Sequence, residues 1–177
     1  MSANNLFTFN VAFTVPVNND PKNPALTVDE VYSGFSRGGE KPHLFASYVA
    51  DTEVLPGRKS ENEFQRRLVI DDGAVHTKRG MELVQDVRQA KNLLTEAITV
   101  DSGARSTMIV SRGGAESDGD DAVYLSAVYE LHVPDVVPGS DRAREIEREY
   151  TQLARGAVNT ALGLVRKWKV DGSLEEP

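Results

Sequence analysis

The chain has 177 residues and is 40% hydrophobic, which supplies enough apolar surface for one domain, residues 1–177, with a continuous core. It contains no cysteine, so disulfides and thiolate metal sites are excluded. The net charge of -7 argues against a nucleic-acid partner, because that binding depends on clustered lysine and arginine. No signal-peptide pattern and no apolar run of roughly 20 residues is present, so we expect a cytoplasmic protein without a membrane span.

The first predicted elements are a strand and a helix. Apolar and polar residues alternate with a period of two over 7–15, which is typical of a half-buried strand. Thr27 and Glu30 have the spacing of a capping box, which predicts a helix that begins there and runs toward the glycines at 38–39. Residues 42–47 favour one further short turn.

The middle of the chain is predicted to be a meander of antiparallel strands. Short apolar or alternating runs are separated by turn-forming dipeptides such as Pro56-Gly57 and Asp72-Gly73. We place the strands near residues 48–55, 62–71, 75–86, 92–100, 105–112 and 121–133.

The last segment is predicted to be a long amphipathic helix. Apolar residues recur at steps of three or four from Ile146 to Trp168, and the helix is expected to begin near Ser140 and to end before Gly172. A helix of that length cannot stay in water with its apolar stripe exposed, and the strands of the meander offer a matching apolar face. We therefore expect an α+β fold in which a curved antiparallel sheet of about seven strands grips this helix.

The element order and three segments resemble one family. The segments are residues 13–18, Phe-Thr-Val-Pro-Val-Asn, residues 26–32, Leu-Thr-Val-Asp-Glu-Val-Tyr, and residues 129–140, which begin Tyr-Glu-Leu-His-Val-Pro. They are similar to the AtaL-like family within the START, birch-pollen-allergen and polyketide-cyclase superfamily, also called SRPBCC. The resemblance covers nearly the whole chain and implies a helix-grip fold with two short helices after the first strand. It implies an internal cavity for a small hydrophobic ligand more firmly than it implies any reaction.

Three charged side chains fall on the apolar parity of their predicted strands, and these are Arg66, Arg79 and Glu96. If the strands are consecutive hairpins, Arg66 or Arg79 pairs with Glu96 inside the cavity, which avoids the cost of an isolated buried charge. With Tyr129, these three are the candidate catalytic residues. The alternative is a β-bulge or a different register that turns the three side chains to solvent.

The candidate ligand-binding residues are the apolar and aromatic side chains of the same faces. They are Phe64, Leu68, Met81, Leu83, Ile98, Met108, Val110, Leu125, Tyr150, Leu153 and Ala157. Core packing is the competing interpretation for each of them, although the phenols of Tyr129 and Tyr150 need hydrogen-bond partners if they are buried.

Several motifs are discounted. The G-x-S-x-G pattern at 34–38 lies at the end of a helix rather than after a strand, so its glycines are interpreted as helix termination instead of a nucleophile elbow. The acidic run at 118–121 lacks the spacing of an EF-hand and favours a hairpin turn. The three histidines, His43, His76 and His132, are far apart and have no zinc-ligand spacing, so we expect no metal and no cofactor.

Three function hypotheses remain. The first is a cofactor-free enzyme that promotes cyclisation, cycloaddition or isomerisation of an apolar natural-product intermediate. In it, Arg66 or Arg79 stabilises an enolate and Glu96 or Tyr129 moves a proton. The second is a carrier that binds a lipid or secondary metabolite without turnover. The third is a protein-interaction module with a filled interior. The sequence supports no particular oligomeric state.

Overall fold

The computed structural model describes residues 6–113 and 122–174, and it has the predicted helix-grip α+β architecture. Along the chain the elements are β1 (Leu6–Pro16), α1 (Val28–Glu40), the 3-10 helix η1 (Pro42–Leu44), β2 (Val49–Val54), β3 (Glu63–Ile70), β4 (Glu82–Ala90), β5 (Leu94–Thr99), β6 (Arg105–Arg112), β7 (Val123–Pro134) and α2 (Asp141–Asp171). The acidic run at 118–121, interpreted as a hairpin turn, lies outside the described residues. No helix in the described part is both long and apolar enough to cross a membrane.

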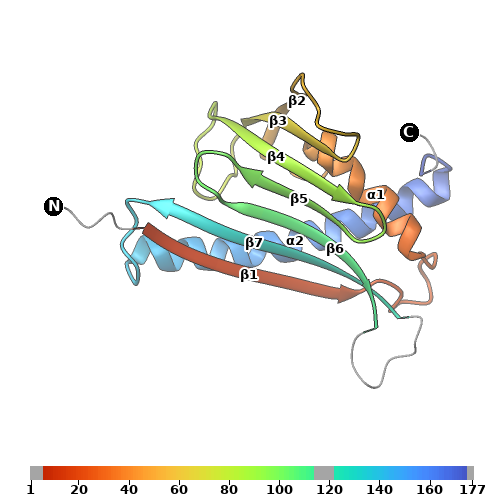
Figure 1. The fold of residues 1–177 in the computed structure, drawn as a ribbon. Coiled ribbons are helices and arrows are strands. Elements are labelled where there is room, and N and C mark those ends of the chain that lie inside the picture. The colour runs from red at the N-terminus through yellow and green to blue at the C-terminus, as the bar shows by residue number, and fades with distance from the viewer. Residues whose placement is uncertain (1–5, 114–121, 175–177) are drawn as a thin grey trace.

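The seven strands form one antiparallel sheet in the order β1-β7-β6-β5-β4-β3-β2 (Figure 1). Six of the strands follow one another as a meander, and β1 joins the sheet by pairing with β7, so that Leu6 lies opposite Pro134. A bulge between Val49 and Asp51 disturbs the register of β2 against β3. Strands β2 and β7, the first and last of the meander, are not neighbours in this order, so the sheet stays open as a curved surface.

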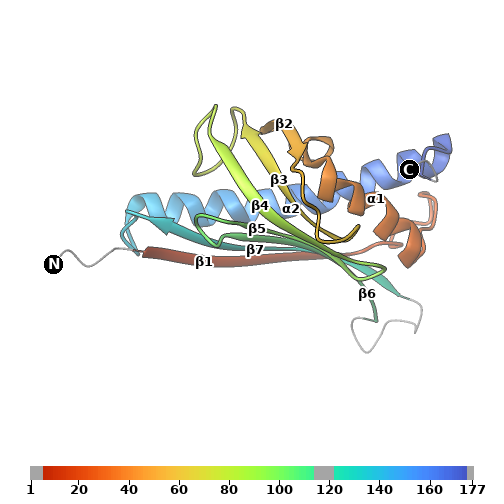
Figure 2. The ribbon, with the colours of Figure 1, turned by 45° about the horizontal axis from the view of Figure 1, so that its top comes forward.

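Helix α2 lies along one face of this sheet (Figure 2). Its 31 residues correspond to about 46 Å of helix. The Ser140 side chain accepts a hydrogen bond from the backbone N–H of Ala143, and Gly172 ends the helix with a φ of 81°, which favours glycine. Both ends agree with the prediction.

Helix α1 begins with the predicted capping box and packs against the C-terminal half of α2. The Glu30 N–H donates to the Thr27 hydroxyl, and the Thr27 N–H donates to the Glu30 carboxylate. Gly34 lies inside α1, and a side chain at its Cα would run into Val165 of α2. The interpretation of Gly34 as helix termination is therefore wrong, because its role is to let two helices approach closely. The pair at 38–39 does lie in the last turn.

Two groups of buried side chains hold α2 to the sheet. One lies under the C-terminal half of α2 and includes Val110, Leu125 and Val165. The other lies near its N-terminal end and includes Phe7, Leu131 and Ile146, together with Tyr150.

The predicted strand at 75–86 begins later than expected. Residues 71–81 form a loop with a glycine at φ 80°, and β4 begins at Glu82 and runs on to Ala90. The alternation of Val75, Thr77 and Arg79 is a loop sequence that happens to have the period of a strand.

Candidate functional site

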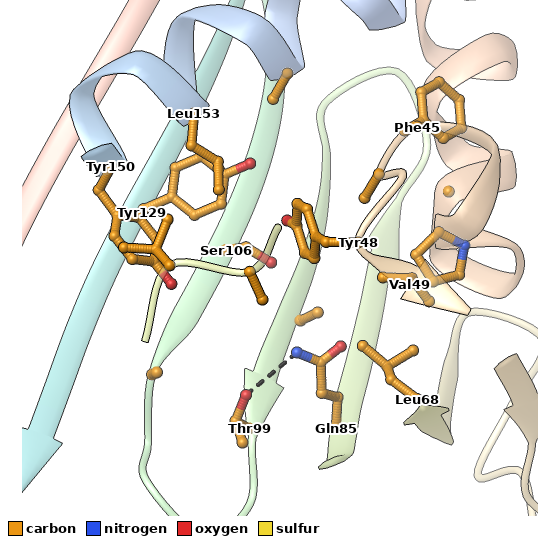
Figure 3. A pocket seen from close by; sticks show the side chains of 18 of the residues that line it. Phe45, Tyr48, Val49, Leu68, Gln85, Thr99, Ser106, Tyr129, Tyr150 and Leu153 are labelled. Carbon is orange, nitrogen blue, oxygen red and sulfur yellow. Dashed lines mark hydrogen bonds between the residues drawn. The ribbon is translucent and has the colours of Figure 1, made fainter. Parts of the chain in front are cut away.

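A cavity of about 740 Å³ lies between the middle of α2 and the sheet. Its walls come from α1, η1, the turn before β2, strands β2 to β7, the loop 71–81 and α2. Figure 3 shows the side chains that project into it, including Tyr48, Gln85, Ser106 and Tyr150. The volume lies within the range of sites that hold drug-sized molecules.

Three phenols project into the cavity. Tyr150 projects from α2 and Tyr129 from β7, and their ring centres are 5.9 Å apart in an edge contact (Figure 3). Tyr48 reaches in from the turn before β2. Burial raises the pKa of all three phenols above the ordinary value, and that of Tyr129 well above it, because a phenolate would lose its hydration. The three groups are therefore neutral hydroxyls at physiological pH and act as hydrogen-bond donors or acceptors.

Arg66 lies in the cavity wall, where it is only 5% exposed. Its Nε and Nη2 donate to the Oε1 of Gln85 at 3.0 and 2.7 Å. Its Nη1 donates to the carbonyl oxygens of Gly38 and Gly39 at 2.6 and 2.7 Å. These carbonyls lie at the C-terminal end of α1, where the helix dipole is negative. Arg66 therefore fastens the end of α1 to the sheet.

The charge of Arg66 has no carboxylate partner within the described part of the chain. Burial lowers the pKa of Arg66 to about 10, which still leaves the guanidinium charged at neutral pH. Among the described residues, the second Nη2 hydrogen has no acceptor. The cavity wall thus carries a buried cation whose partners are all neutral.

The inward face of β5 is made of small and polar residues. Thr95, Ala97 and Thr99 line the cavity, and the Thr99 hydroxyl accepts a hydrogen bond from the Nε2 of Gln85 at 3.2 Å (Figure 3). The Thr95 hydroxyl is buried and has no partner among the described residues. A small side chain on a central strand leaves room above it, and this is one reason why the cavity exists.

His76, in the loop 71–81, contacts the site through Tyr150. Its Nδ1 lies 2.7 Å from the Tyr150 hydroxyl, and the two ring centres are 5.5 Å apart. Burial, and secondly the charge of Arg142, lower the pKa of His76 below its ordinary value, so its ring is neutral at pH 7. When the ring carries its proton on Nε2, Nδ1 accepts the hydrogen bond that the Tyr150 hydroxyl donates.

The structure corrects the predicted placement of Glu96. Thr95, Ala97 and Thr99 point inward, so Glu96 lies on the outer face of β5, where Arg88 and Arg105 contact its carboxylate at 3.5 and 3.6 Å. The expected pair with Arg66 or Arg79 does not form, and Glu96 cannot reach a ligand in the cavity. Ile98 shares the parity of Glu96 and is likewise outside.

Arg79 and Met81 are also outside the cavity. Arg79 lies in the loop 71–81 with its side chain 70% exposed, and it contacts Asp71 and Asp72 at 3.3 and 3.1 Å. Met81 is 41% exposed. Both residues were assigned to the strand predicted over 75–86, but in the structure this strand begins only at Glu82.

Most of the remaining predicted residues line the cavity, and three do not. The lining includes Arg66, Leu68, Leu83, Met108, Tyr129, Tyr150, Leu153 and Ala157. Phe64 packs against Val87 and Ala97 beside the cavity, while Val110 and Leu125 are fully enclosed in the core under α2. These three have the inward parity, but they belong to buried core clusters and not to the cavity wall.

Sequence patterns missed several polar groups of the site, namely Tyr48, Gln85, Thr95, Thr99, Ser106 and His76. Gln85 has the same parity as Leu83, which was a usable signal. Tyr48 and His76 lie outside regular elements, so no periodicity points to them. Within the described residues, no group of three histidine or acidic side chains is arranged to hold a metal ion.

Comparison with known proteins decides the family. The family model of the acetylaranotin biosynthesis cluster protein L, AtaL, matches residues 11–172. The chain belongs to the AtaL family. The protein of that name from Aspergillus terreus (strain NIH 2624 / FGSC A1156) is 55% identical over 176 residues, which is 99% of each chain.

The solved structures similar to this AtaL-family chain agree on the fold. The Zhui aromatase/cyclase from Streptomyces sp. R1128 has a TM-score of 0.61 at 13% identity and covers 93% of this chain and 96% of its own. The di-domain ARO/CYC StfQ from the steffimycin pathway has a TM-score of 0.60 at 11% identity, with 95% of this chain and 52% of its own covered. Ara h 8.0201 has a TM-score of 0.55 at 11% identity, with 90% and 97% covered. These likenesses establish the helix-grip fold.

Proposed function

We propose that this AtaL-family chain binds a small, largely apolar natural-product intermediate and promotes its cyclisation or isomerisation without a cofactor. The observation that carries the proposal is the cavity of about 740 Å³. Its polar groups include the three phenols, Arg66 and Gln85. A largely apolar cavity with a few polar groups suits an apolar molecule that carries one or two oxygens.

The comparisons support a biosynthetic role. The relative from Aspergillus terreus is named for the acetylaranotin biosynthesis cluster, and two of the similar folds are described as aromatase/cyclases. A cyclisation or isomerisation rearranges bonds within one molecule and involves no net oxidation, so side chains can supply the acid, base and hydrogen-bonding groups that it needs.

Three physical effects would contribute to the reaction. The cavity holds a flexible chain in a folded shape, which removes conformational entropy from the barrier. The cation of Arg66 stabilises negative charge that develops on a carbonyl oxygen. The neutral phenols of Tyr48 and Tyr129 donate hydrogen bonds to the same kind of oxygen. In other enzymes, a donor aimed at a developing oxyanion contributes roughly 2.7–4 kcal/mol.

Binding without turnover is the second candidate function. Four N–H groups of Arg66 are already engaged with Gln85, Gly38 and Gly39, so the guanidinium also has a structural role that needs no chemistry. The cavity weighs against the third hypothesis, an interaction module with a filled interior.

The test uses native mass spectrometry of the purified protein mixed with extract of the organism that makes it. A bound metabolite is released, identified and incubated with the protein. We expect a small apolar molecule, and its conversion to a product of the same mass supports the enzyme over the carrier. Capture without conversion supports the carrier. No captured molecule contradicts both.

A matched pair of variants ties the result to the cavity. Ala157 lines the cavity, whereas Thr160, one turn further along α2, is exposed to solvent. Ala157→Phe should abolish capture and Thr160→Phe should leave it unchanged. Equal capture by the two variants would place the binding site elsewhere.

A further inference from the structure

The pair formed by Tyr150 and His76 connects the cavity to its rim. Tyr150 is 8% exposed and lines the cavity from α2, while His76 is half-buried in the loop 71–81. The hydroxyl of the first lies 2.7 Å from Nδ1 of the second. A second hydrogen bond joins the same two elements, because Nη2 of Arg142 donates to the carbonyl oxygen of Val75 at 2.8 Å.

The pKa of Tyr150 is raised by burial, so the phenol keeps its proton. The pKa of His76 is lowered by burial and by Arg142, so its ring is neutral. In the tautomer with its proton on Nε2, the ring accepts the Tyr150 hydrogen bond at Nδ1. A phenol alone is a poor base here, since a buried phenolate is costly. With a neutral imidazole behind it, the oxygen can take up one proton while it releases another.

We propose that Tyr150 is the catalytic base of the cavity and that His76 is its positioning and proton-accepting partner. The inference rests on the proposed function and names the proton-transfer step within it. It also narrows the substrate class to molecules with an acidic C–H next to a carbonyl group, or with an enolic hydroxyl.

Every proton in the transfer from the substrate to water is accounted for. A substrate C–H bond breaks as its proton moves to the Tyr150 oxygen, and the electron pair of that bond becomes the π bond of the enolate. The Tyr150 O–H proton moves to Nδ1 of His76 at the same time, so no phenolate forms. The imidazolium then loses the proton on Nε2 to water. No oxidant or reductant is required, and the reverse sequence returns a proton to carbon.

Five elements that carry or border this pair contribute the other ionisable groups. The loop 71–81 contributes Asp71, Asp72, Lys78 and Arg79; α2 contributes Arg142, Glu145 and Glu149; β6 contributes Arg105; β7 contributes Tyr129; the turn before β2 contributes Tyr48. Arg142 acts on His76 directly and disfavours the imidazolium, which helps the proton to leave.

The experiment uses 2-tetralone, an apolar ketone with slowly exchanging α-hydrogens, as the probe. Its binding is followed by displacement of 8-anilinonaphthalene-1-sulfonate, and its hydrogen–deuterium exchange in D₂O is followed by NMR. The wild type should bind the ketone and accelerate exchange. At saturating ketone, Tyr150→Phe and His76→Gln should lose about 100-fold in exchange rate, a typical general-base effect. The glutamine amide accepts the Tyr150 hydrogen bond but takes up no proton. His76→Gln therefore distinguishes a proton relay through His76 from a purely structural role of this residue.

The pH dependence of the exchange rate is a further test, because a purely structural role of His76 would not produce it. Because the neutral ring is the active form, the wild-type rate should fall as the pH drops below the ordinary histidine pKa of 6.5. His132→Gln is the matched control, since His132 lies on the outer face beside Glu130, and this variant should keep both the rate and the acidic limb.

The remaining outcomes would contradict either the assignment of the base or the proposed function itself. Unchanged exchange in Tyr150→Phe or His76→Gln, or a wild type that binds 2-tetralone without accelerating exchange, overturns the base assignment and leaves the binding function intact. A wild type that binds neither probe overturns the proposed function as well.

Discussion

Neighbouring arginines on β3 show how one residue's surroundings decide its role. Arg66 points into the molecule and contacts neutral groups only, whereas Arg67 points outward to Glu53 and Glu82 at 2.8 and 3.1 Å. The two side chains have the same chemistry and lie on opposite faces of one strand. Only Arg66 both fastens α1 to the sheet and lines the cavity.

Substitution of Arg66 should therefore lower stability. Arg66→Met keeps much of the side-chain volume but leaves three buried acceptors unpaired, the carbonyls of Gly38 and Gly39 and the Gln85 amide. Each unpaired acceptor costs about 1–3 kcal/mol, which together outweigh the relief of no longer burying a cation. We expect the free energy of unfolding in urea to fall by about 1–3 kcal/mol.

Arg67→Met is the control for this measurement. Its ion pairs are exposed to solvent, so the midpoint of unfolding should hardly move. Equal losses in the two variants would mean that the buried network of Arg66 contributes nothing specific.

The inward face was predictable on β3 but not on β5, and the reason is chemical. On β3 the inward residues Phe64, Leu68 and Ile70 are large and apolar, so the hydrophobic period identifies them. On β5 the inward residues are Thr95, Ala97 and Thr99, while the larger Leu94 and Ile98 lie outside. Hydrophobic periodicity locates a filled core. A cavity wall is made of smaller and more polar side chains, so the same rule assigned Glu96 to the wrong face.

At the level of elements, the contact between α1 and α2 depends on a glycine. Gly34 has no side chain, and Val165 occupies the space where one would lie. Gly163, two residues before Val165 on α2, has open space around it.

These two glycines should respond to alanine in opposite ways. Gly34→Ala should destabilise the protein by about 1–3 kcal/mol, because it overpacks the helix contact. Gly163→Ala should stabilise it by about 0.5–1 kcal/mol through helix propensity. Thermal unfolding measures both, and Val165→Ala added to Gly34→Ala should restore part of the loss. A neutral Gly34→Ala would show that the helices can move apart at no cost.

Helix boundaries were the most predictable feature, and loop 71–81 was the least. The capping box at Thr27, the cap at Ser140 and the left-handed Gly172 are local signals that tertiary contacts reinforce. The loop carries no such signal, and its alternating residues imitate a strand. His76 therefore reaches the site through a contact with α2 that is 74 residues distant in sequence, and no sequence pattern points to it.

For the whole molecule, the cavity couples ligand binding to global stability. Its walls belong to both helices and to strands from β2 to β7, so a bound molecule contacts most of the folding unit. 8-Anilinonaphthalene-1-sulfonate at about 100 times its Kd should add about 2.7 kcal/mol to the free energy of unfolding. For a chain of this size, that corresponds to a rise in Tm of roughly 5–10 °C.

Differential scanning fluorimetry by intrinsic fluorescence, or calorimetry, tests this prediction, with Ala157→Phe as the variant that should show no shift. If the dye raised the Tm of both proteins equally, its site would be a surface patch and not the cavity.

The pairing of β1 with β7 has a consequence for how the chain comes into being. Leu6 lies opposite Pro134 and Pro16 opposite Tyr124, so the partners of β1 are 128 and 108 residues further along the chain. At roughly 5–20 residues per second on the ribosome, the first strand waits roughly 5–25 seconds for its partner to be synthesised. Its alternating apolar face, including Phe7 and Phe9, is exposed to chaperones and to other nascent chains during that interval. The edge strand β1 is thus the part of the newborn sheet that waits longest for its partner.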